Sequence, residues 1–117
     1  MTFTKDHFSG STDGLPIKVV NTVLASADTI HTSVANATDF DEVWLYAVNN
    51  DTVNRKLTIC WGGLTNVDHT IAFTVAPQEG LKCIIPGLVI QNSKVIKAFA
   101  EVANKITISG FINRIAV

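Results

Sequence analysis

The sequence predicts a single all-β domain, an eight-stranded antiparallel sandwich or jelly roll with an N-terminal arm. Val, Ile and Thr, which are favoured in strands, make up about a third of the chain. Short apolar runs alternate with turns that contain Asn, Asp, Gly and Pro, and helix signals are weak throughout. At 117 residues, with 47% hydrophobic and 16% charged residues, the chain is long enough to bury one core.

The first 14 residues are predicted to be a flexible arm, and residues 15–117 the sandwich domain. Residues 10–14, Gly-Ser-Thr-Asp-Gly, are typical of a linker and offer no apolar surface of their own. Phe3 and Phe8 are the only large apolar side chains of the arm. We expect both to contact a neighbouring subunit.

The apolar runs that follow the arm predict the positions of the strands. We expect strands near residues 16–22, 28–35, 41–49, 55–62, 69–76, 80–85, 94–102 and 104–113. The short connections predict two antiparallel hairpins, one from residues 41–48 and 55–61 and one from the last two strands. Gly110 is expected to mark a bulge or a close approach of another backbone.

The strand over 41–49 is apolar on both of its faces. Alternation places Val43, Leu45 and Ala47 on one face, and the opposite face carries the candidate subunit interface, Trp44, Tyr46 and Val48. Such a strand is either central in two layers or covers a subunit interface. We therefore expect a homo-oligomer, with a trimer favoured.

Composition argues against two classes of partner. Nine Lys and Arg residues against ten Asp and Glu give a net charge of -1, and the basic residues are scattered singly apart from Arg55 and Lys56. A nucleic-acid partner is not expected, because phosphate-binding surfaces show clustered positive charge. A membrane partner is not expected either, because no apolar run approaches the ~20 residues that span a bilayer. No secretory signal is visible at the N-terminus.

No catalytic signature surrounds the three histidines, His7, His31 and His69. We therefore predict that the chain is not an enzyme, that it has no catalytic residues and that it uses no cofactor. A small enzyme would need a pocket of His and carboxylate groups, with His31 or His69 as its essential residue.

Two sets of side chains leave alternatives open. Cys60 and Cys83 lie in strand-like runs, and they are either reduced buried thiols or a disulfide pair. Their spacing matches no zinc motif. Asp39, Asp41 and Glu42 are either solvated charges at a strand entrance or oxygen ligands for a cation such as Ca²⁺.

Four stretches of the sequence carry a resemblance to a family. Residues 41–51 (DEVWLYAVNND), 55–59 (RKLTI), 85–88 (IPGL) and 108–115 (ISGFINRI) together resemble small β-sandwich virion proteins of tailed bacteriophages, of the capsid decoration or cement type. The resemblance covers about 100 residues and rests on strand patterns.

The resemblance implies a non-enzymatic structural protein of the virion, assembled in the host cytoplasm, that binds the major capsid protein and stabilises the shell. Such proteins are commonly trimers, and the arm with Phe3 and Phe8 would contact the capsid. The alternative function is a carbohydrate-binding or host-adsorption module. In that case Trp44, Tyr46 or Trp61 would be exposed and would stack on a sugar ring.

Overall fold

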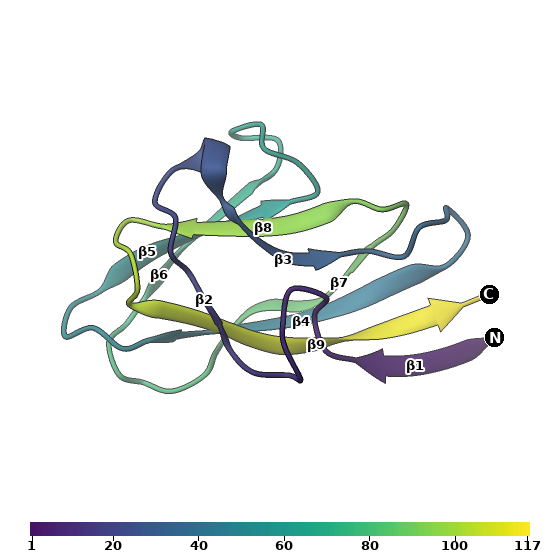
Figure 1. Cartoon of the computed structure of the whole chain (residues 1–117), viewed down its shortest axis with the longest axis horizontal. Coiled ribbons are helices and arrows are strands. Elements are labelled where there is room, and N and C mark those ends of the chain that lie inside the picture. The colour runs from purple at the N-terminus through teal and green to yellow at the C-terminus, as the bar shows by residue number, and fades with distance from the viewer.

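The chain forms two antiparallel β-sheets that pack face to face, as the computed structural model of residues 1–117 shows (Figure 1). The predicted all-β sandwich is thereby confirmed. No helix of the structure has the length and apolar character needed to cross a membrane. The elements are β1 (Thr2–Asp6), β2 (Ile17–Lys18), the 3-10 turn η1 (Leu24–Ser26), β3 (Asp28–Thr32), β4 (Phe40–Asn49), β5 (Arg55–Trp61), β6 (Thr70–Val75), β7 (Lys82–Ile90), β8 (Val95–Ala100) and β9 (Ile106–Ala116).

Sheet A has the strand order β1-β9-β4-β7, with β2 also paired to β9, and sheet B has the order β3-β8-β5-β6. The eight strands β2 to β9 therefore form two four-stranded sheets in which most connections pass from one sheet to the other. This is the double-sheet arrangement of a jelly roll. Strand β1 is an addition at the edge, beside the C-terminal half of β9, so the two termini lie side by side (Figure 1).

Both predicted hairpins are wrong, although their strands are present. Strand β4 belongs to sheet A and β5 to sheet B, and the same separation applies to β8 and β9. Where the chain crosses from β4 to β5, the buried side chain of Asn49 donates hydrogen bonds from Nδ2 to the carbonyl oxygens of Val53 at 2.9 Å and Val75 at 2.8 Å. These bonds satisfy backbone groups of the crossing loop and of sheet B, so the chain changes sheet without leaving buried carbonyls unpaired.

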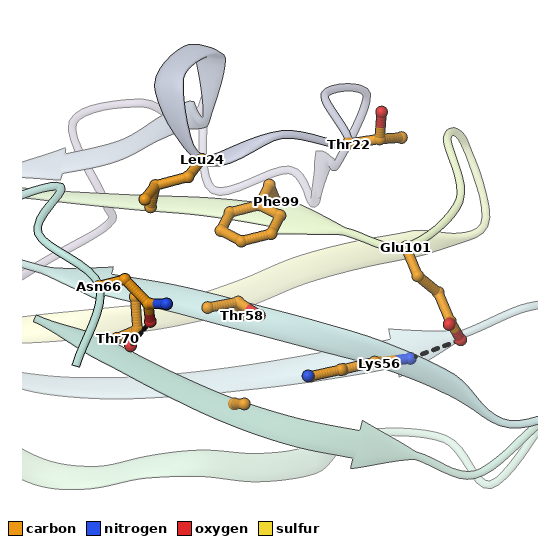
Figure 2. Close-up of a pocket in the computed structure, with 9 residues that line it drawn as sticks. Thr22, Leu24, Lys56, Thr58, Asn66, Thr70, Phe99 and Glu101 are labelled. Carbon is orange, nitrogen blue, oxygen red and sulfur yellow. Dashed lines mark hydrogen bonds between the residues drawn. The ribbon is translucent and has the colours of Figure 1, made fainter.

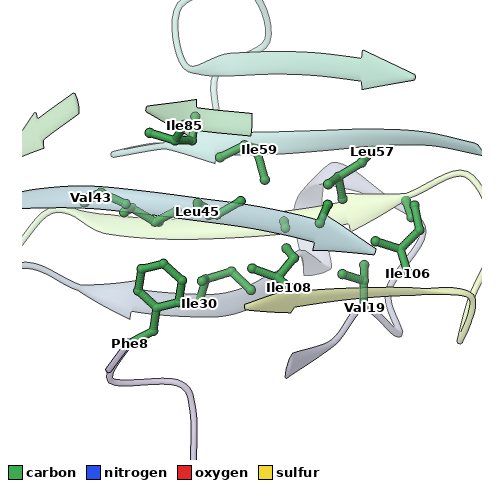
Figure 3. Close-up of a cluster of buried hydrophobic side chains, with 14 of the residues drawn as sticks. Phe8, Val19, Ile30, Val43, Leu45, Leu57, Ile59, Ile85, Ile106 and Ile108 are labelled. Atoms are coloured by element: carbon green, nitrogen blue, oxygen red, sulfur yellow. The ribbon is translucent and has the colours of Figure 1, made fainter. Parts of the chain in front are cut away.

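The core lies between the sheets (Figure 3). It contains 17 buried apolar residues. Sheet A contributes Val43, Leu45 and Ala47 from β4, and sheet B contributes Leu57 and Ile59 from β5. Strand β4 alternates strictly between buried and half-buried residues along its length. The inward half of the predicted pattern therefore forms the core, and the outward half is left for other contacts.

Gly110 sits at the predicted close approach. Its φ is +148°, and a Cβ atom at this position would lie 2.0 Å from the carbonyl oxygen of Trp44. The pairing of β4 with β9 runs through Gly110 without a shift of register, so the glycine marks a close approach and not a bulge. Any side chain here would force the two central strands of sheet A apart.

The N-terminal segment is more integrated with the sandwich than expected. Residues Thr2–Asp6 form β1 on β9, and Phe8 is only 1% exposed within the core (Figure 3). Phe8 is therefore a core residue and cannot contact a capsid, which corrects that expectation. Phe3 remains 68% exposed on β1. The sequence misled because one aromatic residue between polar neighbours shows no periodicity from which burial could be predicted.

Candidate functional site

A polar cluster around a buried carboxylate joins the two sheets, with its arginine partly exposed to solvent. It contains His31 from β3, Asp41 from β4 and Arg114 from β9. The Asp41 side chain is fully buried, and it accepts hydrogen bonds from Arg114 Nε at 2.7 Å, Arg114 Nη2 at 3.0 Å and His31 Nε2 at 2.8 Å. The backbone N–H of Val34 adds a further bond at 3.2 Å.

Strand pairing and an irregularity in β3 bring the side chains of Asp41, Arg114 and His31 together. Asp41 and Arg114 are direct partners in the antiparallel pairing of β4 with β9, so their side chains project to the same side of sheet A. In β3, the register shifts between Thr29 and His31, and both Ile30 and His31 are buried. A regular strand would have turned one of them outward.

The electrostatics of the cluster keep Asp41 ionised. Burial acts to raise the pKa of Asp41, but the hydrogen bonds from Arg114 and His31 and the positive charge of Arg114 outweigh it, so the pKa is lowered from its usual value. The hydrogen bond to Asp41 raises the pKa of Arg114 further. The cluster is thus a charged, hydrogen-bonded tie between the sheets.

The ring of His31 is fixed on both sides. Its Nδ1 accepts a hydrogen bond from the backbone N–H of Ser9 at 3.0 Å, so the ring proton lies on Nε2 and is donated to Asp41. The His31 side chain is only 3% exposed. Neither nitrogen is free to exchange a proton with a substrate, so the arrangement fits a structural role.

The other histidines lie in different surroundings. The Nδ1 atom of His69 accepts a hydrogen bond from the backbone N–H of Thr65 at 3.2 Å, and its ring packs against Gly63. His7 lies at the surface beside Asp6. No group of three or more His, Cys, Asp or Glu side chains is arranged to hold a metal ion.

The three carboxylates at the entrance of β4 point to different partners. Asp41 faces the core, whereas Glu42 faces outward and accepts hydrogen bonds from Trp44 Nε1 at 2.8 Å and Asn113 Nδ2 at 3.1 Å. Asp39 accepts a bond from the backbone N–H of Val117 at 2.9 Å. The three carboxylates do not converge on a common ligand position.

The outer face of sheet A is rich in aromatic side chains. We call it the aromatic face, and it consists of Phe3 from β1, Phe40, Trp44 and Tyr46 from β4, and Phe111 from β9. The rings of Trp44 and Phe111 stack with their centroids 6.3 Å apart and an interplanar angle of 15°.

The predicted interface residues belong to the aromatic face or extend it. Trp44, Tyr46 and Val48 all lie on the outward row of β4, and all are half-buried. Lys5 on β1 sits with its Nζ 4.6 Å from the centroid of the Phe111 ring, so its charge lies over an aromatic surface. Trp61, by contrast, packs against the core, so the three aromatic residues considered for sugar binding do not form one platform.

The outer face of sheet B is hollowed instead. A depression of about 380 Å³ lies between the η1 region, the residue 66 loop and strands β5, β6 and β8 (Figure 2). Leu24 and Phe99 form its apolar side, and Thr58 and Thr70 are among its polar groups. Neither this hollow nor the role of Arg114 was predicted from the sequence, because both are assembled from segments far apart in the chain.

The two cysteines do not form a disulfide. Cys60 is fully buried and Cys83 is exposed, and they belong to strands of different sheets. Burial raises the pKa of the Cys60 thiol above its usual value. The expectation of buried reduced thiols therefore holds for Cys60 and fails for Cys83.

Comparison with protein-family models, curated proteins and solved structures found no match to this chain.

Proposed function

We propose that this chain is a non-enzymatic structural subunit of a bacteriophage virion, of the capsid decoration or cement type. The resemblance of the strand patterns to small virion proteins supports the assignment to a phage. Viral capsid proteins are among the known uses of the jelly-roll arrangement, although a fold alone does not determine a function.

The observation that carries the proposal is the aromatic face. Four of its five aromatic residues lie on β4 and β9, which are the two central strands of sheet A, and all four are half-buried on its outward side. A row of large aromatic side chains on the outside of a sheet is typical of an association surface. We propose that copies of the chain associate through this face, as a trimer, and bind the major capsid protein.

The polar groups on this face are compatible with burial in an interface. The carboxylate of Glu42 already accepts two hydrogen bonds, from Trp44 and Asn113, and Lys5 rests over the Phe111 ring. These contacts lower the cost of desolvating both groups, but each keeps its charge, so the partner surface must supply an opposite charge to Glu42 and to Lys5.

The integration of the N-terminal segment changes how capsid attachment must be tested. Removing residues 1–14 would delete β1 and take Phe8 out of the core, so loss of binding could follow from unfolding. A single exposed residue is a better probe. Phe3 lies 68% exposed at the edge of the aromatic face and remains the candidate capsid contact of this segment.

The decisive experiment compares Tyr46→Lys with Thr74→Lys, which places the same charge on an exposed position of sheet B. We expect light scattering to show an oligomer for the unmodified chain and for Thr74→Lys, and a monomer for Tyr46→Lys. Particles that lack the protein should bind the first two and gain resistance to heat, because many weak contacts act together.

Two results would contradict the proposal. One is a Tyr46→Lys variant that keeps the oligomeric mass and the number of copies bound per particle. The other is an unmodified chain that binds no phage shell at all. Binding to the shell that survives in Tyr46→Lys but is lost in Phe3→Ser would instead assign capsid attachment to β1.

A further inference from the structure

The hollow on the outer face of sheet B has the size of a small-molecule site. Its volume of about 380 Å³ lies at the lower end of the range of ligand pockets, roughly 300–1,000 Å³. Strands β5, β6 and β8 of the sandwich provide its floor, so the lining is held by paired backbone. A site on paired strands keeps its geometry better than one built on loops alone.

One side of the hollow is apolar. Figure 2 shows Leu24 below η1 and the ring of Phe99 on β8, and both side chains line this part of the hollow. Phe99 lies on the outward row of β8, directly opposite Thr58 of β5 in the sheet register. The ring therefore borders a polar floor, and this combination suits a ligand with one apolar face and several hydroxyl groups.

The remaining lining offers hydrogen-bonding groups. Two hydrogen bonds that involve a side chain connect lining residues: Thr70 Oγ1 donates to Asn66 Oδ1 at 3.1 Å, and the backbone N–H of Lys56 donates to Glu101 Oε1 at 2.9 Å (Figure 2). The first bond leaves the amide N–H groups of Asn66 as donors. The hydroxyl of Thr58 takes part in neither bond.

The charges of the hollow balance each other. Lys56 is its only cationic residue and Glu101 its only anionic one. A site for a phosphate or another anion would need an excess of positive charge, and a site for a cation would need the reverse. The lining favours a neutral polar ligand.

From this lining we propose that the hollow binds a single neutral hexopyranose unit of a glycan. The apolar face of the sugar ring packs against Phe99, and its hydroxyl groups bond to Thr58, Thr70 and Asn66. The ammonium group of Lys56 and the carboxylate of Glu101 form hydrogen bonds with hydroxyl groups at one end of the sugar ring.

This inference goes beyond the proposed structural role and does not depend on it. The hollow and the aromatic face lie on the outer sides of different sheets. A subunit that associates through sheet A would keep sheet B open to a glycan. The protein would then both build an assembly and present an array of weak sugar sites, whose combined strength exceeds that of one site.

The test is a titration of the isotope-labelled full chain with glucose, galactose, mannose and N-acetylglucosamine, followed by amide NMR shifts. We expect at least one sugar to cause saturable shifts of residues around Thr58, Thr70 and Phe99, with a Kd on the order of millimolar. Phe99→Ala and the nearly isosteric Thr58→Val should each weaken binding by about tenfold. Tyr46→Lys, on the aromatic face, should leave the affinity unchanged.

Several results would overturn this inference. No saturable shift with any of the four sugars at about 50 mM would do so, since a site weaker than that is not a specific one. Shifts that centre on Trp44, or that survive in folded Phe99→Ala and Thr58→Val proteins, would place binding elsewhere. Saturation by a zwitterionic dipeptide in place of the sugars would assign the hollow to the Lys56 and Glu101 charges. None of these results bears on whether copies of the chain associate through the aromatic face, because the Tyr46→Lys variant tests that association separately.

Discussion

The outer faces of the two sheets follow the same strand geometry but differ in chemistry. The outer face of sheet A presents stacked aromatic side chains, whereas that of sheet B presents threonine residues around a hollow. The inward faces of both sheets are almost entirely aliphatic, as a shared core requires. The comparison shows that the inward half of each strand determines the fold, and that the outward half is free to specify what each face contacts.

Both faces depend on the core beneath them, and removal of the Phe8 ring is expected to have the largest effect on the stability of that core. We expect Phe8→Ala to lower the free energy of unfolding by about 3–5 kcal/mol, because the ring is fully buried and its removal leaves a cavity. Phe3→Ala, a change of the same residue type five positions earlier, should cost less than about 0.5 kcal/mol. Urea denaturation measures both, and equal losses would show that the segment packs differently.

The cluster around Asp41 provides the next test, because it links the sheet that carries the aromatic face to the sheet that carries the hollow. Asp41→Asn leaves Arg114 and His31 without their anion, so we expect a loss of about 3 kcal/mol of stability. Asp39→Asn alters a carboxylate that lies at the surface, so its loss should be much smaller. A stable Asp41→Asn protein would show that the tie contributes little.

The same carboxylate predicts a dependence of stability on pH. The pKa of Asp41 is lowered in the folded protein, so the ionised form stabilises the fold above the ordinary value of 3.8 and this contribution is lost as the pH falls below it. The stability difference between the unmodified protein and Asp41→Asn should therefore shrink between neutral pH and pH 3. Denaturation curves at several pH values measure this difference in stability. A difference that stays constant or widens as the pH falls would contradict the prediction.

The sequence predicts the strands well because each strand carries its own periodic signal. Each of the eight predicted strands overlaps an observed one, although β2 is limited to Ile17–Lys18 and β7 extends to Ile90. The alternation within residues 41–49 correctly separates the core side chains from those of the aromatic face. The added strand β1 was not predicted, because its five residues are all exposed and have no apolar period.

Pairing was harder to predict, since it depends on contacts between distant segments. The short connections after β4 and β8 have the length of hairpin loops, yet both cross between the sheets. The deciding contacts, such as the bond from Asn49 to the carbonyl of Val75, join residues that are 26 positions apart. Arg114 was missed for the same reason, because its partner Asp41 lies 73 positions away. Local patterns cannot report such pairs.

The smallest expected effect concerns reactivity, and it compares the two sheets through their cysteines. Cys83 is exposed on β7 and pairs in register with Tyr46 of the aromatic face, whereas Cys60 of sheet B is buried and burial raises the pKa of its thiol. A thiol reagent should therefore modify Cys83 about tenfold faster than Cys60, or more, because the accessible thiolate is the reacting form. Mass spectrometry of the modified peptides measures both rates. If copies associate through the aromatic face, Cys83 should also react more slowly at high protein concentration, and Tyr46→Lys should abolish that protection. A Cys83 rate that is independent of concentration in the unmodified protein would place the subunit contact away from this part of sheet A.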